Sequence, residues 1–240
     1  IIIPSDNKEN IESTIQSILE KSTYQFFELI IVTKSTILNK IKSEKIDKRV
    51  KLVSYDKPFN FSDKCNIGAK HSIGEFLIFF NDDVRVISND WIDCILEYLA
   101  LEDVGIVVPN LLYANNTIQH AGMVTGVRRL IGTAFHSLPK NTTLHYNFAQ
   151  SVREVSLICG ACLAINSKVF KKVKGFDAVN FPINHSDVDL CFKVRALGLT
   201  CVYTPYPNLV HIGHMSLAEV DRDKPITKNE KDKADIQLLK

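Results

Sequence analysis

The stretch FLIFFNDD, residues 76–83, decides the fold of this 240-residue chain. Five consecutive apolar residues that end at acidic groups indicate a buried strand whose carboxyl end opens at the edge of a sheet. In open α/β sheets this edge is where ligands bind. Two adjacent carboxylates, Asp82 and Asp83, repel each other and are costly to desolvate unless a cation joins them. A divalent metal that also binds phosphate oxygens would meet that need. The alternative is an Asx-rich turn, since Asn and Asp favour turns.

Strands alternate with helices through the first half of the chain. Apolar runs at 1–3, 27–32, 50–53 and 76–80 predict four strands. The segments between them have helical periodicity. Such alternation implies parallel pairing through right-handed crossovers. The sequence therefore predicts an α/β fold with a Rossmann-like, mostly parallel central sheet flanked by helices.

The second half is less regular and predicts a smaller mixed region. A helix is expected over 91–99, a strand over 105–108 and a hairpin turn at 115–116, whereas 126–150 predicts a variable loop or an irregular helix. The apolar run 155–165 predicts one strand, kinked or bulged at Gly160. A helix over 186–197 ends at Gly198, and short strands follow at 201–203 and 209–210.

Composition fits one globular domain over residues 1–240. The chain is 45% hydrophobic and 23% charged, and a domain of this length buries a sizeable core without disulfides. A net charge of +2 gives no strong field for nucleic acid, so we expect no such partner. The chain opens inside a strand without Met, so we expect a domain excised from a longer protein, with residues 221–240 as a charged tail.

The six cysteines point to a reduced setting. Cys159 and Cys162 form a CxxC pair with no second pair and no His at zinc-finger spacing, so structural filling of the core is favoured over a zinc or redox role. A cytoplasmic location follows weakly. The sequence contains no signal peptide and no apolar run of membrane-spanning length.

A series of short motifs runs in order along nearly the whole chain. They are IIIP (1–4), YDKPFNFS (55–62), CNIGA (65–69), GEF (74–76), NDD (81–83), TIQHAG (117–122), GAC (160–162), GFD (175–177), DVDLC (187–191) and YTPY (203–206). Each is weak alone, but the order and spacing resemble glycosyltransferase family 2, the inverting GT-A fold enzymes that use nucleotide-activated sugars. YDKPFNFS and TIQHAG particularly resemble the rhamnosyltransferase-like branch associated with O-antigen and capsule synthesis.

The resemblance implies an activity and its partners. Residues 1–110 would be the nucleotide-sugar-binding half, and 111–220 the acceptor and catalytic half. The implied cofactors are a divalent metal (Mn or Mg) and a dTDP-, UDP- or GDP-sugar donor. The acceptor would be a glycan or a lipid-linked glycan. The implied location is cytoplasmic, with peripheral association at the inner membrane face through segments outside this chain.

The same resemblance assigns a metal site. Asp83 is the first choice for the direct ligand, and Asp82 is closer to the ribose or behind the ligands. This chain has NDD where many relatives have DxD, so the assignment within the pair stays open. His211 matches a family His that completes the site, and imidazole suits manganese better than magnesium. The alternative for His211 is a hydrogen bond to backbone, and His214 is a substitute ligand.

Asp187 matches the catalytic base of the family. A positioned carboxylate, ionised at neutral pH, takes the proton of the acceptor hydroxyl. Asp189 is its rival, but residues two apart on a helix face different sides. The spacing of Ser186 and Asp189 also predicts an S-x-x-D cap. Many relatives carry Glu where this chain has Ser186, which points to acceptor contacts there.

Further residues are expected around the two substrates. Thr33 is a departure, because relatives commonly place at that position an Asp that binds the base or ribose. Trp91 is either core or a platform for sugar C–H groups. His120 and His136 are expected in loops or on the acceptor side, together with Gly160 and Ala161. The expected nucleotide contacts are Pro4, Ser5, Asn7, Asp56, Asn66 and Lys70.

Two other functional classes compete with a glycosyltransferase. A degenerate domain that binds glycan or nucleotide-sugar as a scaffold in a larger synthase is favoured by Thr33. The combination of Asp83, Asp187 and His211 argues against it, because a binder needs no base. A nucleotidyltransferase is disfavoured, since no Gly-rich basic loop follows the first strand.

Overall fold

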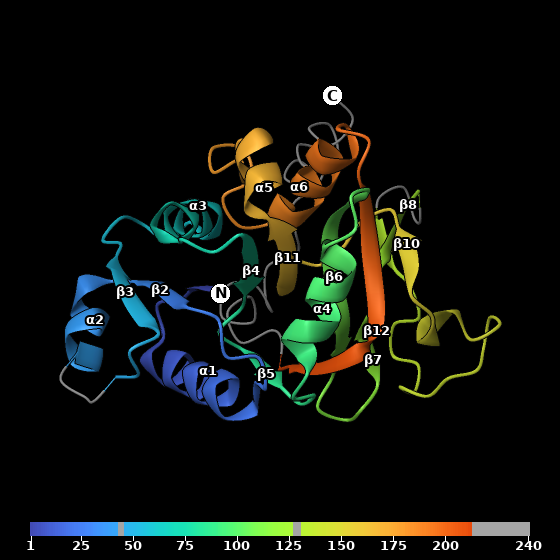
Figure 1. Cartoon of the computed structure of the whole chain (residues 1–240), viewed down its shortest axis with the longest axis horizontal. Coiled ribbons are helices and arrows are strands. Elements are labelled where there is room, and N and C mark those ends of the chain that lie inside the picture. The colour runs from blue at the N-terminus through green and yellow to red at the C-terminus, as the bar shows by residue number, and fades with distance from the viewer. Residues whose placement is uncertain (43–45, 127–130, 213–240) are drawn as a thin grey trace, which may run out of the picture.

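Strand β4 (Phe76–Phe80) lies within a ten-stranded mixed sheet in the computed structural model, which describes residues 1–42, 46–126 and 131–212. The strand order is β10-β12-β6-β11-β4-β1-β2-β3, with β5 on β12 and β7 on β6. Helices cover both faces of the sheet (Figure 1). Within these described residues, none of the helices is long and apolar enough to cross a bilayer.

The first half follows the predicted alternation. Strands β1 (Ile2–Pro4), β2 (Leu29–Thr33), β3 (Val50–Ser54) and β4 pair in parallel. The helices between them are α1 (Lys8–Lys21), α2 (Ser35–Lys42) and α3 (Phe61–His71). Asn7 caps α1 through Asn10 N–H, and Asn60 caps α3 through Asp63 N–H. Each cap satisfies one of the free N–H groups at a helix start.

The second half returns to the same sheet with mixed directions. Its first elements are β5 (Val84–Val86), α4 (Trp91–Leu99), β6 (Val104–Leu112), β7 (Ile118–His120), β8 (Met123–Thr125) and β9 (Ile131–Thr133). They are followed by a 3-10 turn η2 (Phe148–Gln150), β10 (Arg153–Val155), β11 (Cys162–Asn166), α5 (Ser167–Lys172), α6 (Ser186–Arg195) and β12 (Thr200–His211). β11 is antiparallel to both β4 and β6 and joins the two halves of the sheet.

Two expectations for the second half need correction. The single strand over 155–165 is wrong, because β10 pairs with β12 whereas β11 pairs with β4 and β6, and residues 156–161 cross between them. The two short strands at 201–203 and 209–210 are one strand, β12, with an irregularity between Thr204 and Asn208. β6 extends across residue 110, so the two halves, whose functional division stays a prediction, share one sheet. The charged tail lies outside the described residues.

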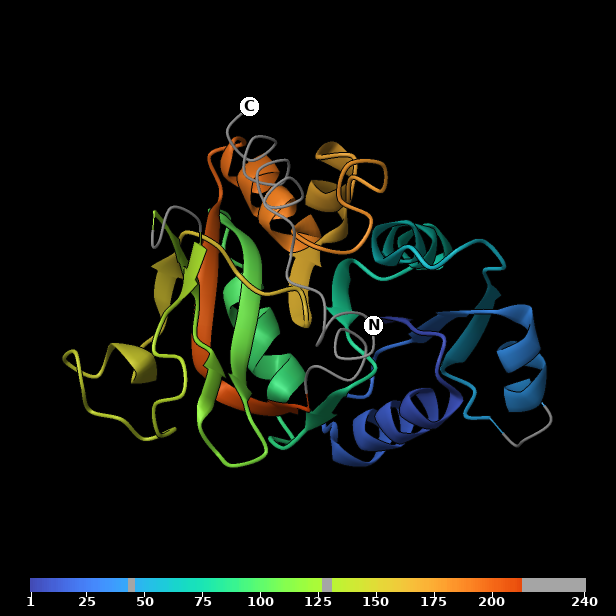
Figure 2. The ribbon, with the colours of Figure 1, turned by 180° about the vertical axis from the view of Figure 1, so that it is seen from behind.

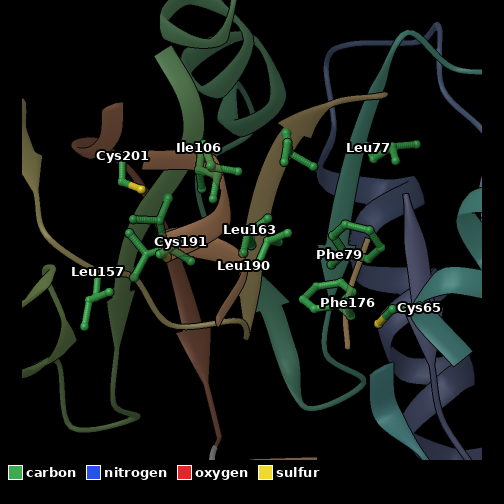
Figure 3. Close-up of a cluster of buried hydrophobic side chains, with 14 of the residues drawn as sticks. Cys65, Leu77, Phe79, Ile106, Leu157, Leu163, Phe176, Leu190, Cys191 and Cys201 are labelled. Atoms are coloured by element: carbon green, nitrogen blue, oxygen red, sulfur yellow. The ribbon is translucent and has the colours of Figure 1, made fainter. Parts of the chain in front are cut away.

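Alternation along the strands separates two cores. Leu77 and Phe79 point to the face covered by α3, α5 and α6, and Ile78 and Phe80 point to the face covered by α1, α2 and α4. Figure 3 shows part of the first core, where Phe79 and Phe176 lie beside Cys65 and where Leu163 and Leu190 continue the cluster. Burial on both faces explains the continuous apolar run of β4.

β12 carries the chain across the molecule toward the site. It lies beside β6 along its length and meets β5 at its end (Figure 2). In that antiparallel pairing His211 stands opposite Val84. The register therefore brings His211 next to Asp83, although 128 positions separate them in the chain.

Candidate active site

Asp83 and His211 form a close pair at the end of β4. His211 Nε2 lies 3.1 Å from Asp83 Oδ1, and both side chains are largely buried. A backbone hydrogen bond from Ile212 N to Asp83 O, 2.9 Å long, fixes the two segments together. Burial acts to raise the pKa of Asp83, but the adjacent His211 imidazole outweighs it, and the pKa lies below its usual value. Asp83 is therefore ionised at neutral pH.

Gln119 sets the orientation of the His211 ring. Its Oε1 lies 2.5 Å from His211 Nδ1, and its Nε2 donates to His211 O at 3.3 Å. A carbonyl oxygen only accepts, so Nδ1 carries the proton of the neutral ring. Nε2 then presents a lone pair to Asp83 Oδ1, which is itself a buried oxygen without a hydrogen-bond partner. Two acceptors at this separation repel each other unless a cation joins them, either a proton on Nε2, which is the state that holds the pKa of Asp83 down, or a metal ion.

This donor set fits a divalent metal. A carboxylate oxygen and an imidazole nitrogen, with the ring held by an amide behind it, are a ligand pair suited to Mn²⁺. In the parts of the chain that the structure describes, no cluster of three or more His, Cys, Asp or Glu side chains has metal-binding geometry. Within those residues, Asp83 and His211 would be two ligands of such a cation, and phosphate or water oxygens would supply the rest.

Asp82 ties the end of β4 to the end of β1. Ser5 Oγ donates to Asp82 Oδ2, and Asn10 Nδ2 lies 3.5 Å from the same oxygen. Thr14 and Arg85 hold the Asp82 carbonyl at 2.6 and 2.8 Å. Burial raises the pKa of Asp82, and the charge of Asp83 raises it further. The hydrogen bond from the Ser5 hydroxyl acts to lower it but is outweighed. Within the NDD motif, Asp82 and Asp83 thus have different surroundings.

Asp187 is held at the start of α6 by backbone N–H groups. Gly160 N donates to its Oδ2 at 2.7 Å, and Val188 N donates to its Oδ1 at 2.9 Å. Burial raises the pKa of Asp187 although both N–H groups act to lower it. A Cβ on Gly160 would lie 3.2 Å from Asp187 Cβ, so glycine lets the backbone approach this carboxylate.

A short chain of contacts joins the two acidic groups. Gly160 holds Asp187, and the next residue, Ala161, accepts a 2.9 Å hydrogen bond from Asn81 N. Cys159 lies in the field of both carboxylates. Burial is the main reason that its pKa rises to about 12, and the charges of Asp187 and Asp83 add to the rise. The structure therefore brings the predicted metal ligand and the predicted base to one edge of the sheet.

The alternatives around Asp187 are resolved by geometry. Asp189 forms an ion pair with Lys193 Nζ at 2.6 Å, one turn along the helix. The predicted S-x-x-D cap is wrong, since α6 has His185 as its N-cap and no side-chain cap bond. The predicted acceptor contact of Ser186 is also contradicted, because this side chain is buried and donates to Ile183 O.

Several expected nucleotide contacts have structural partners. Asn66 uses both ends of its amide on the backbone of Phe176. Lys70 lines a cavity of about 290 Å³ between α3 and α5 beside Leu77, at the opposite end of β4 from Asp83, and its expected phosphate contact stays a prediction. Asn7, beside the buried Pro4 and Ser5, is exposed at the start of α1.

At the ends of the next two strands, the expected contacts differ in exposure. Thr33 is fully buried, so direct contact with a ligand is excluded there. Asp56 is exposed and holds Ser35 at the start of α2, with its Oδ1 2.8 Å from Ser35 N. The Asp56 carboxylate therefore lies at the surface, but it already has a partner.

Trp91 belongs to the core. It is 0% exposed, its ring packs on Phe80, and its Nε1 donates to Ser22 Oγ at 2.8 Å. The sugar-platform interpretation is therefore wrong, and the core interpretation is confirmed. Cys162 is also buried in the core.

The two histidines expected in loops differ in their surroundings, and His120 is the last residue of strand β7. His120 is buried, and its Nε2 faces the N–H groups of Gly122 and Cys159, so burial lowers its pKa to about 3. His136 is exposed and contacts Tyr113 OH at 2.8 Å. His214 lies outside the described residues.

Sequence reasoning missed two residues of the site. Gln119 orients His211, and Lys64 is fully buried between the ends of β1 and β2. A signal existed for Lys64, because a lysine one position from Cys65 and three from Phe61 falls on the apolar face of an amphipathic helix. For Gln119, the only signal in the sequence was its place in the TIQHAG motif.

Comparison with known proteins identifies the family. Residues 1–174 match the family model for glycosyl transferase family 2. This chain belongs to glycosyltransferase family 2. The match ends before Asp187 and His211, so for these two residues the structure supplies the placement.

Two curated relatives extend the likeness of this family 2 chain. It is 33% identical over 231 residues to protein y4gI of Sinorhizobium fredii (strain NBRC 101917 / NGR234), which covers 94% of this chain and 25% of the relative. It is 30% identical over 216 residues to the O-antigen biosynthesis protein RfbC of Myxococcus xanthus, which covers 88% of this chain and 17% of the relative. The chain thus spans a quarter or less of either relative.

Solved structures show the same fold. GalNAc-T7 with UDP, GalNAc and Mn²⁺ superposes with a TM-score of 0.71 at 16% identity, over 95% of this chain and 45% of that one. The mannosyltransferase PcManGT from Pyrobaculum calidifontis, with GDP-Man and Mn²⁺, gives 0.62 at 16% identity, over 98% and 68%. The predicted GT-A fold of this family 2 chain is confirmed.

Proposed function

We propose that this glycosyltransferase moves a hexose or deoxyhexose, such as rhamnose, from a nucleotide-sugar to a hydroxyl of a surface glycan, with inversion of the anomeric centre. The observation that carries the proposal is the junction at the sheet edge, where Gly160 holds Asp187 and Ala161 holds the segment of Asp83. The Myxococcus xanthus relative is named an O-antigen biosynthesis protein, which supports a surface glycan as the acceptor. A lipid-linked glycan at the inner membrane face would be an acceptor of this kind.

Asp187 acts as the general base. The N–H groups of Gly160 and Val188 fix its carboxylate in one orientation, and each oxygen keeps a lone pair for an incoming hydroxyl. The raised pKa strengthens its proton affinity. The acceptor hydroxyl then passes its proton to Asp187 as the oxygen attacks the donor sugar.

Asp83 and His211 would hold a divalent cation, with Mn²⁺ favoured by the imidazole. A cation bound there would supply charge neutralisation for a departing nucleoside diphosphate, whether it is dTDP, UDP or GDP. Gln119 contacts His211 Nδ1 and thereby orients Nε2 toward the Asp83 carboxylate. Asp82 braces the neighbouring turn through Ser5.

A scaffold that only binds nucleotide-sugar is the second candidate, and the buried Thr33 is the observation that favours it. A scaffold has no need for a carboxylate that is buried and oriented by two N–H groups. Asp187 therefore favours the enzyme.

The test is a turnover assay of the purified chain. The protein is incubated with Mn²⁺, a panel of UDP-, dTDP- and GDP-sugars, and surface-glycan oligosaccharides, and the released nucleoside diphosphate is measured. We expect release with at least one donor, loss of release with EDTA, and a product whose anomeric configuration by NMR is opposite to that of the donor. Nucleotide-sugar binding without turnover across the panel would establish the scaffold instead.

A further inference from the structure

Asp6, directly after β1, has one carboxylate oxygen without a hydrogen-bond partner. Its Oδ2 is buried and accepts no hydrogen bond, while Lys34 Nζ lies 3.7 Å away, which is an ion-pair distance too long for a hydrogen bond. A buried oxygen that accepts no hydrogen bond is costly. Asp56, at the end of β3, differs because both of its oxygens hold Ser35.

Lys64 fixes the other oxygen of Asp6. Its Nζ lies 2.6 Å from Asp6 Oδ1 and 2.9 Å from Ser5 O, and it faces Val32 O at 3.4 Å. The Lys64 side chain is 0% exposed, so its ammonium group contacts Asp6 and the two strand ends rather than solvent. Lys64 thereby orients Asp6 so that Oδ2 is the oxygen left for another donor.

The position of Asp6 matches the carboxylate that is missing at Thr33. Ser5 N donates to Val32 O at 3.1 Å, so the turn carrying Asp6 lies directly against the end of β2. Thr33 itself is fully buried, and its Oγ1 has no partner. The end of β2 therefore presents no hydrogen-bond acceptor to a ligand. The Asp6 carboxylate, from the turn after β1, lies beside it.

An aromatic surface accompanies this carboxylate. Lys64 Nζ lies 5.0 Å from the centre of the Phe59 ring and 5.4 Å from that of Tyr55. Phe59 remains 43% exposed, so one part of its ring is open to a planar ligand. Lys34, which covers Asp6 Oδ2, is 48% exposed in its side chain and is free to move aside. A planar group with an N–H at its edge fits this combination.

We propose that Asp6, held by Lys64, is the specificity-determining carboxylate for the nucleobase of the donor, in place of a carboxylate at position 33. This inference rests on the proposed function. Asp6 Oδ2 accepts the ring N–H of uracil, thymine or guanine. Cytosine and adenine present a lone pair at the corresponding ring nitrogen, which a carboxylate repels, so the site selects bases that carry this N–H.

The experiment measures affinities by calorimetry with Mn²⁺ present, for UDP, dTDP, GDP, CDP and pyrophosphate. In the wild type we expect UDP, dTDP or GDP to bind more tightly than CDP. Asp6→Asn lowers the affinity of the preferred nucleotide by about tenfold to a hundredfold, because a charge-assisted bond is lost. It leaves pyrophosphate affinity unchanged. The control Asp93→Asn, at an exposed residue of α4, keeps the wild-type ratio of UDP to CDP.

The variant Asp6→Asn/Lys64→Met removes the ion pair as a unit and keeps the test available if Asp6→Asn alone does not fold. We expect it to lose the base preference and to retain pyrophosphate binding. An Asp6 variant that binds pyrophosphate and keeps the wild-type ratio of UDP to CDP overturns the inference but leaves the proposed function standing. A wild-type protein that binds neither pyrophosphate nor any nucleotide with Mn²⁺ overturns both.

Discussion

Asp83 and Asp187 lie at the same sheet edge, yet their surroundings shift their pKa values in opposite directions. An imidazole faces Asp83 and holds its pKa down against burial, whereas Asp187 has only two backbone N–H groups and burial raises its pKa. A carboxylate whose pKa is held down suits metal ligation, and one with raised proton affinity suits base chemistry. Two identical side chains thus have opposite pKa shifts because their neighbours differ.

Removing the base gives the largest expected effect. Asp187→Asn keeps the shape of the side chain but cannot accept the hydroxyl proton, so kcat falls by about a hundredfold to ten-thousandfold. Affinity for Mn²⁺ and nucleoside diphosphate stays near wild type. The matched control is Asp189→Asn, whose carboxylate pairs with Lys193, and its kcat is expected to be close to wild type. Turnover that survives Asp187→Asn would break the contrast between the two carboxylates.

Loosening the histidine tests the metal side of the comparison. Gln119→Leu removes the acceptor that keeps His211 Nδ1 protonated, and loss of such a supporting contact lowers metal affinity by about tenfold to a hundredfold. Titration of Mn²⁺ in the presence of nucleoside diphosphate measures the change. Gln16→Leu, on the exposed side of α1, serves as the control. Equal Mn²⁺ affinities of the two variants would remove His211 from the ligand set.

Acid pH tests the direction of the Asp187 shift. Its folded pKa is raised, so the base takes up a proton at a higher pH than an ordinary aspartate, and kcat falls as pH drops through that raised value. In Gly160→Ala the added Cβ crowds Asp187 and weakens a hydrogen bond that lowers this pKa. The acid limb of the kcat profile therefore moves to higher pH. A limb that stays in place, or moves down, contradicts this assignment.

The smallest effect is expected at Trp91. Trp91→Phe loses the hydrogen bond to Ser22 Oγ and lowers the free energy of unfolding by about 1 kcal/mol, measured by urea denaturation. The KM values for donor and acceptor stay unchanged, because the ring is in the core and not at the site. A raised acceptor KM at unaltered stability would return Trp91 to the acceptor side.

The parallel half of the fold could be read from the sequence because its signals are local. Each strand from β1 to β4 is a short apolar run, and the helices between them have their own periodicity and Asn caps. The acceptor half could not be read as well. The turn from β10 into β11 depends on which distant strands each pairs with, and 155–165 is mostly apolar. Hydrophobic periodicity carries no information about which distant strands pair with each other.

The candidate site was predictable only where a motif carried it. Asp83, Asp187 and His211 came from motif positions, and the register of β12 against β5 brings the first and last together. Lys64 and Gln119 orient other residues, so no spacing in the sequence predicts the role of either. Trp91 shows the opposite error, because an aromatic residue on an amphipathic helix has the same pattern in a core as at a ligand.

The segment from Ser186 to His211 is one helix followed by one strand, and it carries both Asp187 and His211. In the proposed function, the base and one metal ligand therefore lie in one continuous segment, whereas Asp83 and the nucleotide contacts lie far upstream. An insertion within this segment is expected to displace both groups at once, because the helix and the strand follow each other directly in the chain.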